Sequence, residues 1–465
     1  MAQALSPALG SRAEKRAFYK LALRTTLPIA LQNLMDAAVN SADVIMLSFV
    51  SQSALAASSL AGQIAFVLFN LVYGISSGAS VMAAQYWGKG DGRTVEKVLG
   101  LSLRTVILVG ALFSAAAFLV PEWLMRIFTD DPALITEGIS YLRAVSLSYV
   151  LGGFASVYLA VMRSVGRVKS SAAIHCSAVF MNIFFNACFI FGIGPFPKLG
   201  IMGVGLATSI TRVIEVLVCL LHTSQCRQVR LRLRDLLARG GMLMRDFIRF
   251  AIPAAANDII WGLAFSVYSI ILGHLSSDIV AANSVASVVR NLGTAFCFGS
   301  ASSAAIILGN AMGDNRLEEA RVYGRRFVGM AVWTALLGGA AILLMRPLVL
   351  DFMHIYVVVT DVVRAELNTM LFINAYYILG MSLNTMLICG IFRAGGDVKY
   401  GLMCDTFAMW GYAVPIGLIC AFVLKLPEMW VYFILCLDEF VKLPVNFRHY
   451  FKGKWLKNIT REQTE

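Results

Sequence analysis

Residues 27–60 read LPIALQNLMDAAVNSADVIMLSFVSQSALAASSL, and residues 252–285 read IPAAANDIIWGLAFSVYSIILGHLSSDIVAANSV. The two segments align without a gap at an offset of 225, and both are long and apolar with a few polar side chains among them. A segment that recurs at a fixed distance indicates an internal duplication, which predicts an architecture of related halves.

Two further pairs of segments recur in the same order along the chain. QYWGKGDGRTVEKV is similar to LGNAMGDNRLEEAR, which pairs Asp91 with Asp314 at an offset of 223. MRSVGRVKS is similar to FRAGGDVKY, which pairs Gly166 with Gly396 at an offset of 230. Because three pairs keep one order, we expect a chain of two similar halves.

The composition places the chain in a membrane. It has 465 residues, of which 58% are hydrophobic and 14% are charged, whereas a soluble globular protein carries about 25% charged residues. Twelve segments are apolar over the roughly 17–25 residues that a helix needs to cross a bilayer. The predicted spans are residues 24–49, 58–86, 98–121, 134–161, 170–194, 201–222, 246–273, 278–311, 323–347, 363–391, 399–424 and 427–447. They are uniformly apolar and much longer than about ten residues, so we expect helices and not barrel strands.

The repeat and the spans together predict an all-α integral membrane protein of two pseudo-symmetric six-helix bundles. The N-terminal lobe is expected at residues 1–222 and the C-terminal lobe at residues 246–465, with a basic cytoplasmic linker at residues 223–245 between them. Because six is an even number, both lobes enter the membrane in the same direction and are parallel repeats. Such repeats are typical of transporters that work by alternating access.

The positive charge follows the expected membrane topology. The net charge is +12, and 31 of the 39 Lys and Arg residues lie in the two tails and in the even-numbered loops between the predicted spans. Cytoplasmic loops of membrane proteins collect Lys and Arg, so both termini are expected in the cytoplasm. The same distribution accounts for the basic character of the chain without a nucleic-acid partner.

A polar stripe runs along the first predicted span. Asn33, Asp36, Asn40 and Asp43 are spaced so that they fall within about 80° of one another on one helix face. Ionisable groups inside a membrane are costly and are functional by default. We therefore predict that Asp43, assisted by Asp36 and Asn40, binds a proton or another cation. Structural acids neutralised by basic partners are the alternative interpretation.

Two carboxamides in the fifth predicted span are candidates for the same site. Asn182 and Asn186 are four residues apart and share a helix face. They can ligate a cation or complete a hydrogen-bond network with Asp43.

At the offset of 225 the second half has a corresponding stripe made of different side chains. The four equivalent positions are Asp258, Trp261, Phe265 and Tyr268. One acid followed by three aromatic rings suits organic cations, through charge pairing and cation–π contact. We predict that this stripe holds substrate, with ordinary packing of bulky side chains as the alternative.

Other polar side chains in the spans are assigned partners. Arg290 is the expected partner of Asp258 or of Asp405, in support of the substrate site. Arg212 and Glu215, one turn apart, are expected to pair with each other. A structural salt-bridge cluster is expected in the last span, from Asp438, Glu439 and Lys442.

At this point the chain resembles the multidrug and toxic compound extrusion (MATE) family of bacterial efflux transporters. The resemblance covers nearly the whole chain, in both halves and in order. It is carried by PIALQNLMDAAVNSADVIML, AAQYWGKGD, MRSVGRVK, MNIFFNACFIFG, FRAGGDVKYGLMCDTFAMWGYAVPIG and DEFVKLPVNFRHYFKGKWLKNIT. It implies a twelve-helix, two-lobe antiporter that drives organic cations out across the bacterial inner membrane, using a proton or sodium gradient.

The resemblance also implies roles for individual residues. The first-helix acid of the family corresponds to Asp43, and a seventh-helix acid corresponds to Asp258. A fifth-helix pattern matches Asn182 and Gly192, but Asn186 stands where some members carry an acid. The tenth-helix acid of some sodium-coupled members has no counterpart here, so coupling by that arrangement is not expected.

The expected activity is thus export of small organic cations or drugs in exchange for H⁺ or Na⁺, with no cofactor and no metal apart from Na⁺ near Asp43. We expect a monomer in a lipid bilayer. A lipid-linked oligosaccharide or lipid flippase of the same superfamily is the alternative, although an acidic stripe suits an anionic substrate poorly. An enzyme is not expected, because HExxH, GxSxG and phosphate-loop motifs do not occur in the spans. A channel is disfavoured by the two-fold repeat with buried acids.

Overall fold

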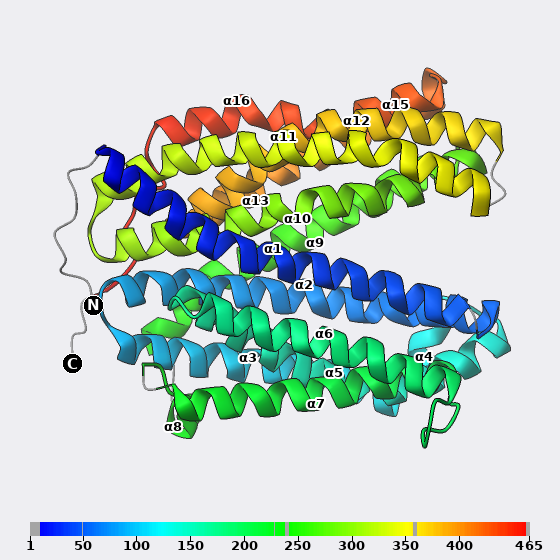
Figure 1. Ribbon diagram of the computed structural model, residues 1–465, viewed down its shortest axis with the longest axis horizontal. Helices are drawn as coiled ribbons and strands as arrows, with labels where there is room; N and C mark the ends of the chain where they lie inside the picture. Colours follow the sequence, from blue (N-terminus) through cyan, green and yellow to red (C-terminus); the bar gives the residue numbers. More distant parts are fainter. Residues whose placement is uncertain (1–9, 49, 227, 238–240, 357–359, 462–465) are drawn as a thin grey trace. The chain divides into compact units, whose positions relative to one another are not determined.

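A computed structural model describes residues 10–48, 50–226, 228–237, 241–356 and 360–461. Over these ranges every regular element is a helix (Figure 1). The elements are α1 (Arg12–Ser48), α2 (Gln52–Gly88), α3 (Gly92–Leu119), α4 (Pro121–Arg126), α5 (Pro132–Ser164), α6 (Val168–Phe191), α7 (Ile201–Gln225), α8 (Leu233–Leu237), α9 (Gly241–Gly273), α10 (Ser277–Gly313), α11 (Leu317–Tyr356), α12 (Asp361–Thr385), the π-helix η1 (Met386–Phe392), α13 (Val398–Thr406), the π-helix η2 (Phe407–Ala413), α14 (Val414–Leu418), the π-helix η3 (Ile419–Val423), α15 (Glu428–Leu435) and α16 (Asp438–Phe451). The prediction of an all-helical membrane protein is confirmed.

Ten helical segments of the described chain are long and apolar enough to cross a membrane. They correspond to the second to eleventh predicted spans. The first predicted span lies in α1, which has 37 residues but carries the polar stripe. The last predicted span is divided, because α15 ends at Leu435 and α16 begins at Asp438.

The helix starts repeat in the two halves. Ser51 caps α2 by accepting a hydrogen bond from the amide of Ala54 over 2.9 Å. Ser276 caps α10 by accepting one from the amide of Ile279 over 3.2 Å. A serine at the N-cap satisfies an amide that has no partner inside the helix. The two caps are related by the same offset of 225 as the repeated segments.

The glycine-rich turn after α2 also recurs after α10, but in a register that differs from the predicted one. The amide of Asp91 donates to the carbonyl of Tyr86, and the amide of Arg316 donates to that of Ala311 in the same way. The left-handed residue is Gly90 in the first turn and Asn315 in the second. The backbone therefore pairs Asp91 with Arg316, at the offset of 225. The predicted pairing of Asp91 with Asp314 was wrong, because it matched side chains across the turn rather than backbone positions.

The turn after α5 recurs as predicted. Gly166 and Gly396 both adopt positive φ, of 84° and 74°. The amide of Gly166 donates to Arg163, and the amide of Gly396 donates to Arg393. Glycine is favoured at such positions because it has no Cβ to clash with the backbone. The offset of 230 thus holds at the start of α6 and of α13.

The chain forms two compact units. Unit 1 consists of residues 1–33 and 256–465, and unit 2 consists of residues 34–255. Each of the equivalent helices α1 and α9 contributes its first part to one unit and its remainder to the other. The predicted division into lobes at residues 1–222, 223–245 and 246–465 stays a prediction.

Unit 2 is built around α5, which packs against α2, α3 and α7. Close approach of α5 and α7 depends on Gly205, where a Cβ would lie 2.8 Å from the Cβ of Ala144. In addition α6 packs along α7, with Phe189 at their contact with Gly203. This packing brings the polar faces of α6 and α7 together.

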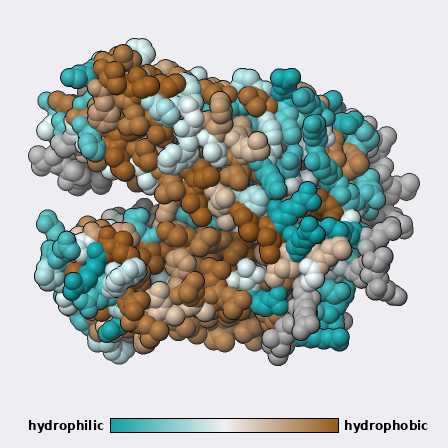
Figure 2. All heavy atoms as spheres, turned by 180° about the vertical axis from the view of Figure 1, so that it is seen from behind, coloured by the Kyte–Doolittle hydropathy of each residue, from teal (hydrophilic) through white to brown (hydrophobic). Residues whose placement is uncertain are grey.

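Unit 1 packs α10, α11 and α12 against one another, and α16 lies along α12 (Figure 1). Tyr376 of α12 stacks on Phe440 of α16, with ring centroids 4.3 Å apart. Large apolar side chains are nevertheless exposed, among them Leu112 on α3 and Leu344 on α11. Figure 2 shows many apolar side chains on the face in view. Such a surface fits a lipid environment.

Candidate functional site

Asp43 is held by a chain of amide contacts within unit 2. The side-chain nitrogen of Asn186 donates to the Oδ1 atom of Asp43 over 2.6 Å. The same nitrogen lies 3.2 Å from the Oδ1 atom of Asn182, whose own amide donates to the hydroxyl of Thr208 over 3.3 Å. Asn186 is fully buried. The prediction that the two carboxamides form a network with Asp43 is confirmed.

The arrangement offers oxygen ligands around one carboxylate. Asn186 Oδ1 is buried and accepts no hydrogen bond among the described residues. A carboxylate, carboxamide oxygens and a hydroxyl form a donor set that hard cations prefer. A proton on Asp43 would meet the same need, because it removes a charge that is costly inside a membrane. The network is therefore suited to a proton or a small monovalent cation.

The other members of the predicted stripe do not join this network. The side-chain amide of Asn33 donates to the carbonyl of Ala295 within unit 1, over 3.2 Å. The side chain of Asn40 lies outside the part of the chain that the structure describes. Asp36 contacts a residue that the sequence analysis overlooked, His175 of α6. The stripe is one helix face, but its members meet different neighbours.

His175 is the centre of a second polar cluster in unit 2. Its Nε2 atom lies 2.7 Å from Asp36 Oδ1, and its Nδ1 atom lies 3.4 Å from Glu215 Oε1. The guanidinium of Arg212 donates to the other oxygen of Glu215, so the predicted pairing of these two residues is confirmed. His175 stands two helical turns before Asn182, on the same helix face. That spacing was the signal that could have found it.

Asp258 has a basic partner in unit 1, but a different one from the predicted residue. Its Oδ1 atom lies 3.8 Å from the guanidinium of Arg393, the C-cap residue of η1, and its Oδ2 atom is buried without a hydrogen-bond partner among the described residues. The pairing of Arg290 with Asp258 or Asp405 was wrong. Helix periodicity gave the face of α10 on which Arg290 stands, but not the helix that it meets.

The aromatic stripe of α9 is continuous. The rings of Trp261 and Phe265 lie 4.3 Å apart, and those of Phe265 and Tyr268 lie 5.5 Å apart. Arg290 lies over the ring of Phe265 at 5.3 Å. The hydroxyl of Tyr268, which is buried, donates to Asp438 over 3.3 Å. Phe265 and Tyr268 thus have polar or cationic partners inside the protein, whereas the Oδ2 atom of Asp258 has no hydrogen-bond partner among the described residues.

Asp405 belongs to the buried cluster of α16. The ammonium of Lys442 lies 3.0 Å from Asp405 and 2.8 Å from Glu439. The amide of Asn384 donates to Glu439 over 2.8 Å, and Asn446 donates to Asn384 over 2.8 Å. The predicted pairing of Glu439 with Lys442 is therefore confirmed, with Asp405 as an additional member, whereas Asp438 accepts hydrogen bonds from Tyr268 and from the amide of Glu439.

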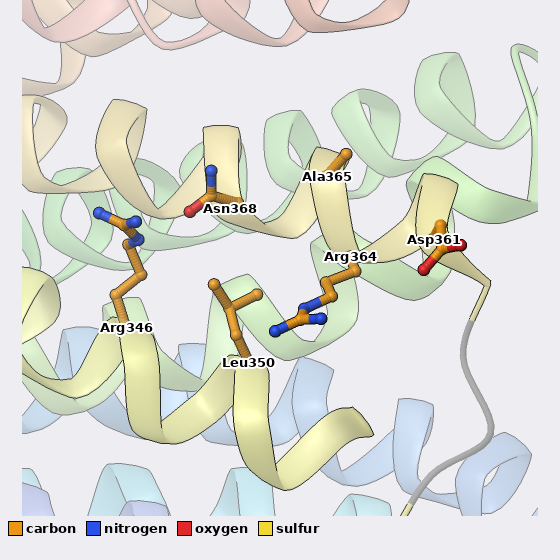
Figure 3. Close-up of a pocket in the computed structure, with 6 residues that line it drawn as sticks. All are labelled: Arg346, Leu350, Asp361, Arg364, Ala365 and Asn368. Carbon is orange, nitrogen blue, oxygen red and sulfur yellow. The ribbon is translucent and has the colours of Figure 1, made fainter. Parts of the chain in front are cut away.

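A pocket of about 340 Å³ lies at the ends of α11 and α12 in unit 1 (Figure 3). Figure 3 shows Arg346 from α11 and Asn368 and Arg364 from α12 along its wall. None of the predicted site residues lines it. In the described ranges there is also no group of three or more His, Cys, Asp or Glu side chains arranged to hold a metal ion.

The comparisons with known proteins agree with this architecture. The family model MatE matches residues 28–188 and 253–419, so the starts of the two matches are related by the same offset of 225. The chain is 23% identical over 438 residues to "Uncharacterized transporter YisQ" of Bacillus subtilis, which covers 93% of this chain and 94% of that protein. It is 24% identical over 420 residues to "Multidrug resistance protein PmpM" of Pseudomonas aeruginosa, with 89% and 85% covered.

Solved structures share the fold. One, titled "Outward-facing conformation of a multidrug resistance MATE family transporter of the MOP superfamily", superposes with a TM-score of 0.86 at 20% identity and covers 95% of this chain and 97% of that one. Two family-model matches cover more than half of the sequence, one in each half. The chain therefore belongs to the MatE family of membrane transporters.

Proposed function

We propose that this protein exports small organic cations and drugs across the plasma membrane in exchange for H⁺ or Na⁺. The observation that carries the proposal is the contact between Asp43 and Asn186 inside unit 2. An intramembrane carboxylate held by carboxamides is a group that can take up and release a cation. Membership of a transporter family and similarity to multidrug resistance proteins of bacteria support the export of drugs.

In this proposal, ion coupling belongs to unit 2. Asp43 binds the proton or Na⁺, while Asn182 and Asn186 supply the neighbouring polar atoms. When the cation is bound, the charge of the carboxylate is compensated and the network around it rearranges. Asp36 is left out of this site, because it is engaged with His175.

Substrate binding belongs to unit 1 in this proposal. Asp258 supplies a carboxylate oxygen that has no hydrogen-bond donor among the described residues, and Trp261 supplies an aromatic face nearly one turn further along α9. Charge pairing together with cation–π contact favours organic cations. Phe265 and Tyr268 act as packing partners of Trp261, since their own polar contacts are taken up by Arg290 and Asp438.

Coupling requires that the ion and the substrate oppose each other. By linkage, an ion that lowers the affinity for substrate must itself bind more weakly when substrate is present. Alternating access of the two repeats, with both termini in the cytoplasm, supplies the two states that such a coupling needs.

The test is ethidium efflux from cells that express the protein, with the proton and sodium gradients collapsed separately. We expect efflux to stop with one of the two gradients and to be absent in the Asp43→Asn variant. Asp130→Asn, an exposed acid in the turn before α5, is the matched control and should export normally. Normal export by Asp43→Asn contradicts the coupling site. A wild type that exports no cation contradicts drug export and favours the flippase.

A further inference from the structure

The polar side chains of unit 2 form two layers. Asp43, Asn182 and Thr208 belong to the first layer. Moving seven positions along each of the same three helices leads to Asp36 on α1, His175 on α6 and Glu215 on α7. Seven positions are close to two full turns, so each helix presents both of its polar groups on one face, about 10 Å apart. The second layer lies toward the N-terminal end of α1.

The second layer places an imidazole between two carboxylates. Nε2 lies 2.7 Å from Asp36 and Nδ1 lies 3.4 Å from Glu215. A neutral imidazole has one N–H and can donate to one of them only, whereas the protonated ring donates to both. Glu215 Oε1 is buried and has no hydrogen-bond partner within normal range in the described chain. A second proton on the ring is therefore what would let it donate to Asp36 and to this oxygen at the same time.

In the second half of the chain the counterparts of His175, Arg212 and Glu215 form a cluster with the charges reversed, whereas Trp261 stands at the position of Asp36. His175 corresponds to Asp405 at the offset of 230, since α6 begins at Val168 and α13 at Val398. Helix α7 begins at Ile201 and α15 at Glu428, which gives an offset of 227 for this part of the repeat. At that offset the pair Arg212–Glu215 corresponds to Glu439–Lys442.

The reversed charges show how the cluster of unit 2 differs from the cluster in the second half. In the second half Lys442 contacts both of its carboxylates, at 3.0 and 2.8 Å, so the three groups are a lysine, an aspartate and a glutamate. In the first half Glu215 lies between Arg212 and His175. An arginine is always positively charged, whereas a histidine is charged only when its ring is protonated. Histidine is the side chain whose charge changes between pH 5 and 8 without further perturbation.

We propose that His175, between Asp36 and Glu215, is a second proton-binding site of unit 2, separate from Asp43. Taking up a proton lets the ring donate to both carboxylates, and releasing it frees Glu215 Oε1. The role of this site in a proton pathway rests on the proposed exchange of H⁺ for drug. Proton binding at His175 does not depend on that exchange.

Charged and titratable groups face the site from the helices packed against it. On α7, Arg212 holds the far oxygen of Glu215. On α5, Arg163 interacts electrostatically with Asp36 and with Tyr73 of α2. On α6, Cys176 interacts with Asp36. The two arginines partly neutralise the carboxylates, so the ring can lose its proton without leaving two bare charges.

The site also favours a proton over a metal ion. The two ring nitrogens point away from each other, and each faces one carboxylate. A single ion on one nitrogen could therefore reach one carboxylate but not both.

The experiment titrates the histidines of the full-length protein in lipid nanodiscs by ¹⁵N NMR, between pH 5 and 9. The chain has five histidines, and the His175→Gln variant identifies the signal to follow. We expect that signal to change from a doubly protonated to a neutral ring within the range. Asp36→Asn, at a side chain that is 53% exposed, should shift its midpoint, whereas His274→Gln, in the turn after α9, should not. A signal that keeps one form throughout, or that ignores Asp36→Asn, overturns the proposal.

Ethidium transport in proteoliposomes separates this proposal from the proposed function. If the wild type transports, its rate should show a step with pH that is lost in His175→Gln and kept in His274→Gln. A step that survives in His175→Gln overturns the pathway role. If the wild type does not transport ethidium, drug export fails, and the NMR titration still decides whether His175 binds a proton. Zn²⁺ added during the titration should leave the His175 signal unchanged, and selective broadening of that signal overturns the site in favour of a metal.

Discussion

Asp36 and Asp43 lie two turns apart on one face of α1, yet Asp36 contacts His175 over 2.7 Å and Asp43 accepts a hydrogen bond from Asn186 over 2.6 Å. One polar stripe thus serves two clusters, both completed by α6. The partner on α6, and not the position in the stripe, determines the surroundings of each carboxylate. We therefore expect substitutions of His175 and of Asn186 to have different effects.

The first prediction concerns Asn186. Replacing it with Ala removes the amide that donates to Asp43, whereas Asn182→Ala removes a group that reaches Asp43 only through Asn186. A hydrogen bond to a charged group contributes about 1.5–3 kcal/mol, which corresponds to roughly a ten- to hundredfold change in an equilibrium constant. We expect the concentration of coupling ion for half-maximal efflux to change by that factor in Asn186→Ala and by less in Asn182→Ala. Equal effects would place both amides at the same distance from the ion.

The second prediction concerns substrate charge. Asp258→Asn keeps the size of the side chain but removes the carboxylate that faces Arg393. We expect the affinity for cationic substrates to fall more than that for neutral ones, because only the former lose a charge partner. Competition of both kinds of compound against ethidium measures this difference. A variant that weakens both kinds equally would assign Asp258 to structure.

The third prediction concerns Lys442. Lys442→Met leaves Asp405 and Glu439 buried without their cation, and breaking a buried ion pair in this way costs about 3–5 kcal/mol. Arg126→Ala breaks an ion pair with Glu122 in which both side chains are more than half exposed, and such pairs contribute about 1 kcal/mol or less. Denaturant unfolding in detergent compares the two variants. Similar losses of stability would show that the cluster of α16 does not hold unit 1 together.

The fourth prediction concerns pH and the start of α1. Both guanidinium nitrogens of Arg326 donate to the carboxylate of Glu14, each over 2.6 Å. These hydrogen bonds hold the pKa of Glu14 below its ordinary value of 4.5, and the amide of Gly10 adds to the effect. A carboxyl with a lowered pKa stabilises the folded state at pH values above 4.5, and that contribution is lost as the pH falls through the lowered pKa.

The corresponding measurement compares the melting temperature of the wild type with that of Glu14→Gln from pH 7 to pH 3. We expect the wild type to be the more stable above pH 4.5 and the difference to close as the pH falls further. A difference that stays constant over the whole range would mean that packing, and not the charge of Glu14, is responsible.

Much of the fold follows from the sequence, because apolar length indicates where most of the long helices form and the internal repeat indicates how the halves correspond. Helix periodicity also indicated the face that Asp43 shares with its neighbours, and the spacing of Asn182 and Asn186 placed both on a matching face of α6. Periodicity carries no information about which helix a face meets. For that reason the predicted partner of Asp258 or Asp405 was Arg290, although Asp258 lies beside Arg393, at the end of η1 and several helices further along the chain.

Two other features were hidden for related reasons. The end of α15 at Leu435 interrupts the last predicted span, and no proline or glycine stands near the break, between Trp430 and Lys442. His175 was overlooked because a single histidine in an apolar span is most often a core residue. Its place in a polar cluster follows from the two-turn spacing shared by α1, α6 and α7, and this spacing is seen only when the three helices are compared.

The reversed charges of the two halves have a consequence for the history of the gene. A duplication starts with two identical copies, and recombination between them can exchange segments for as long as the copies remain equivalent. Here, moving the α13 segment alone into the place of α6 would include the change His175→Asp, which sets a third acid beside Asp36 and Glu215. The charges of α6 and α7 must be inherited together. The two copies have therefore stopped being interchangeable, and each helix is now fitted to the partners of its own half.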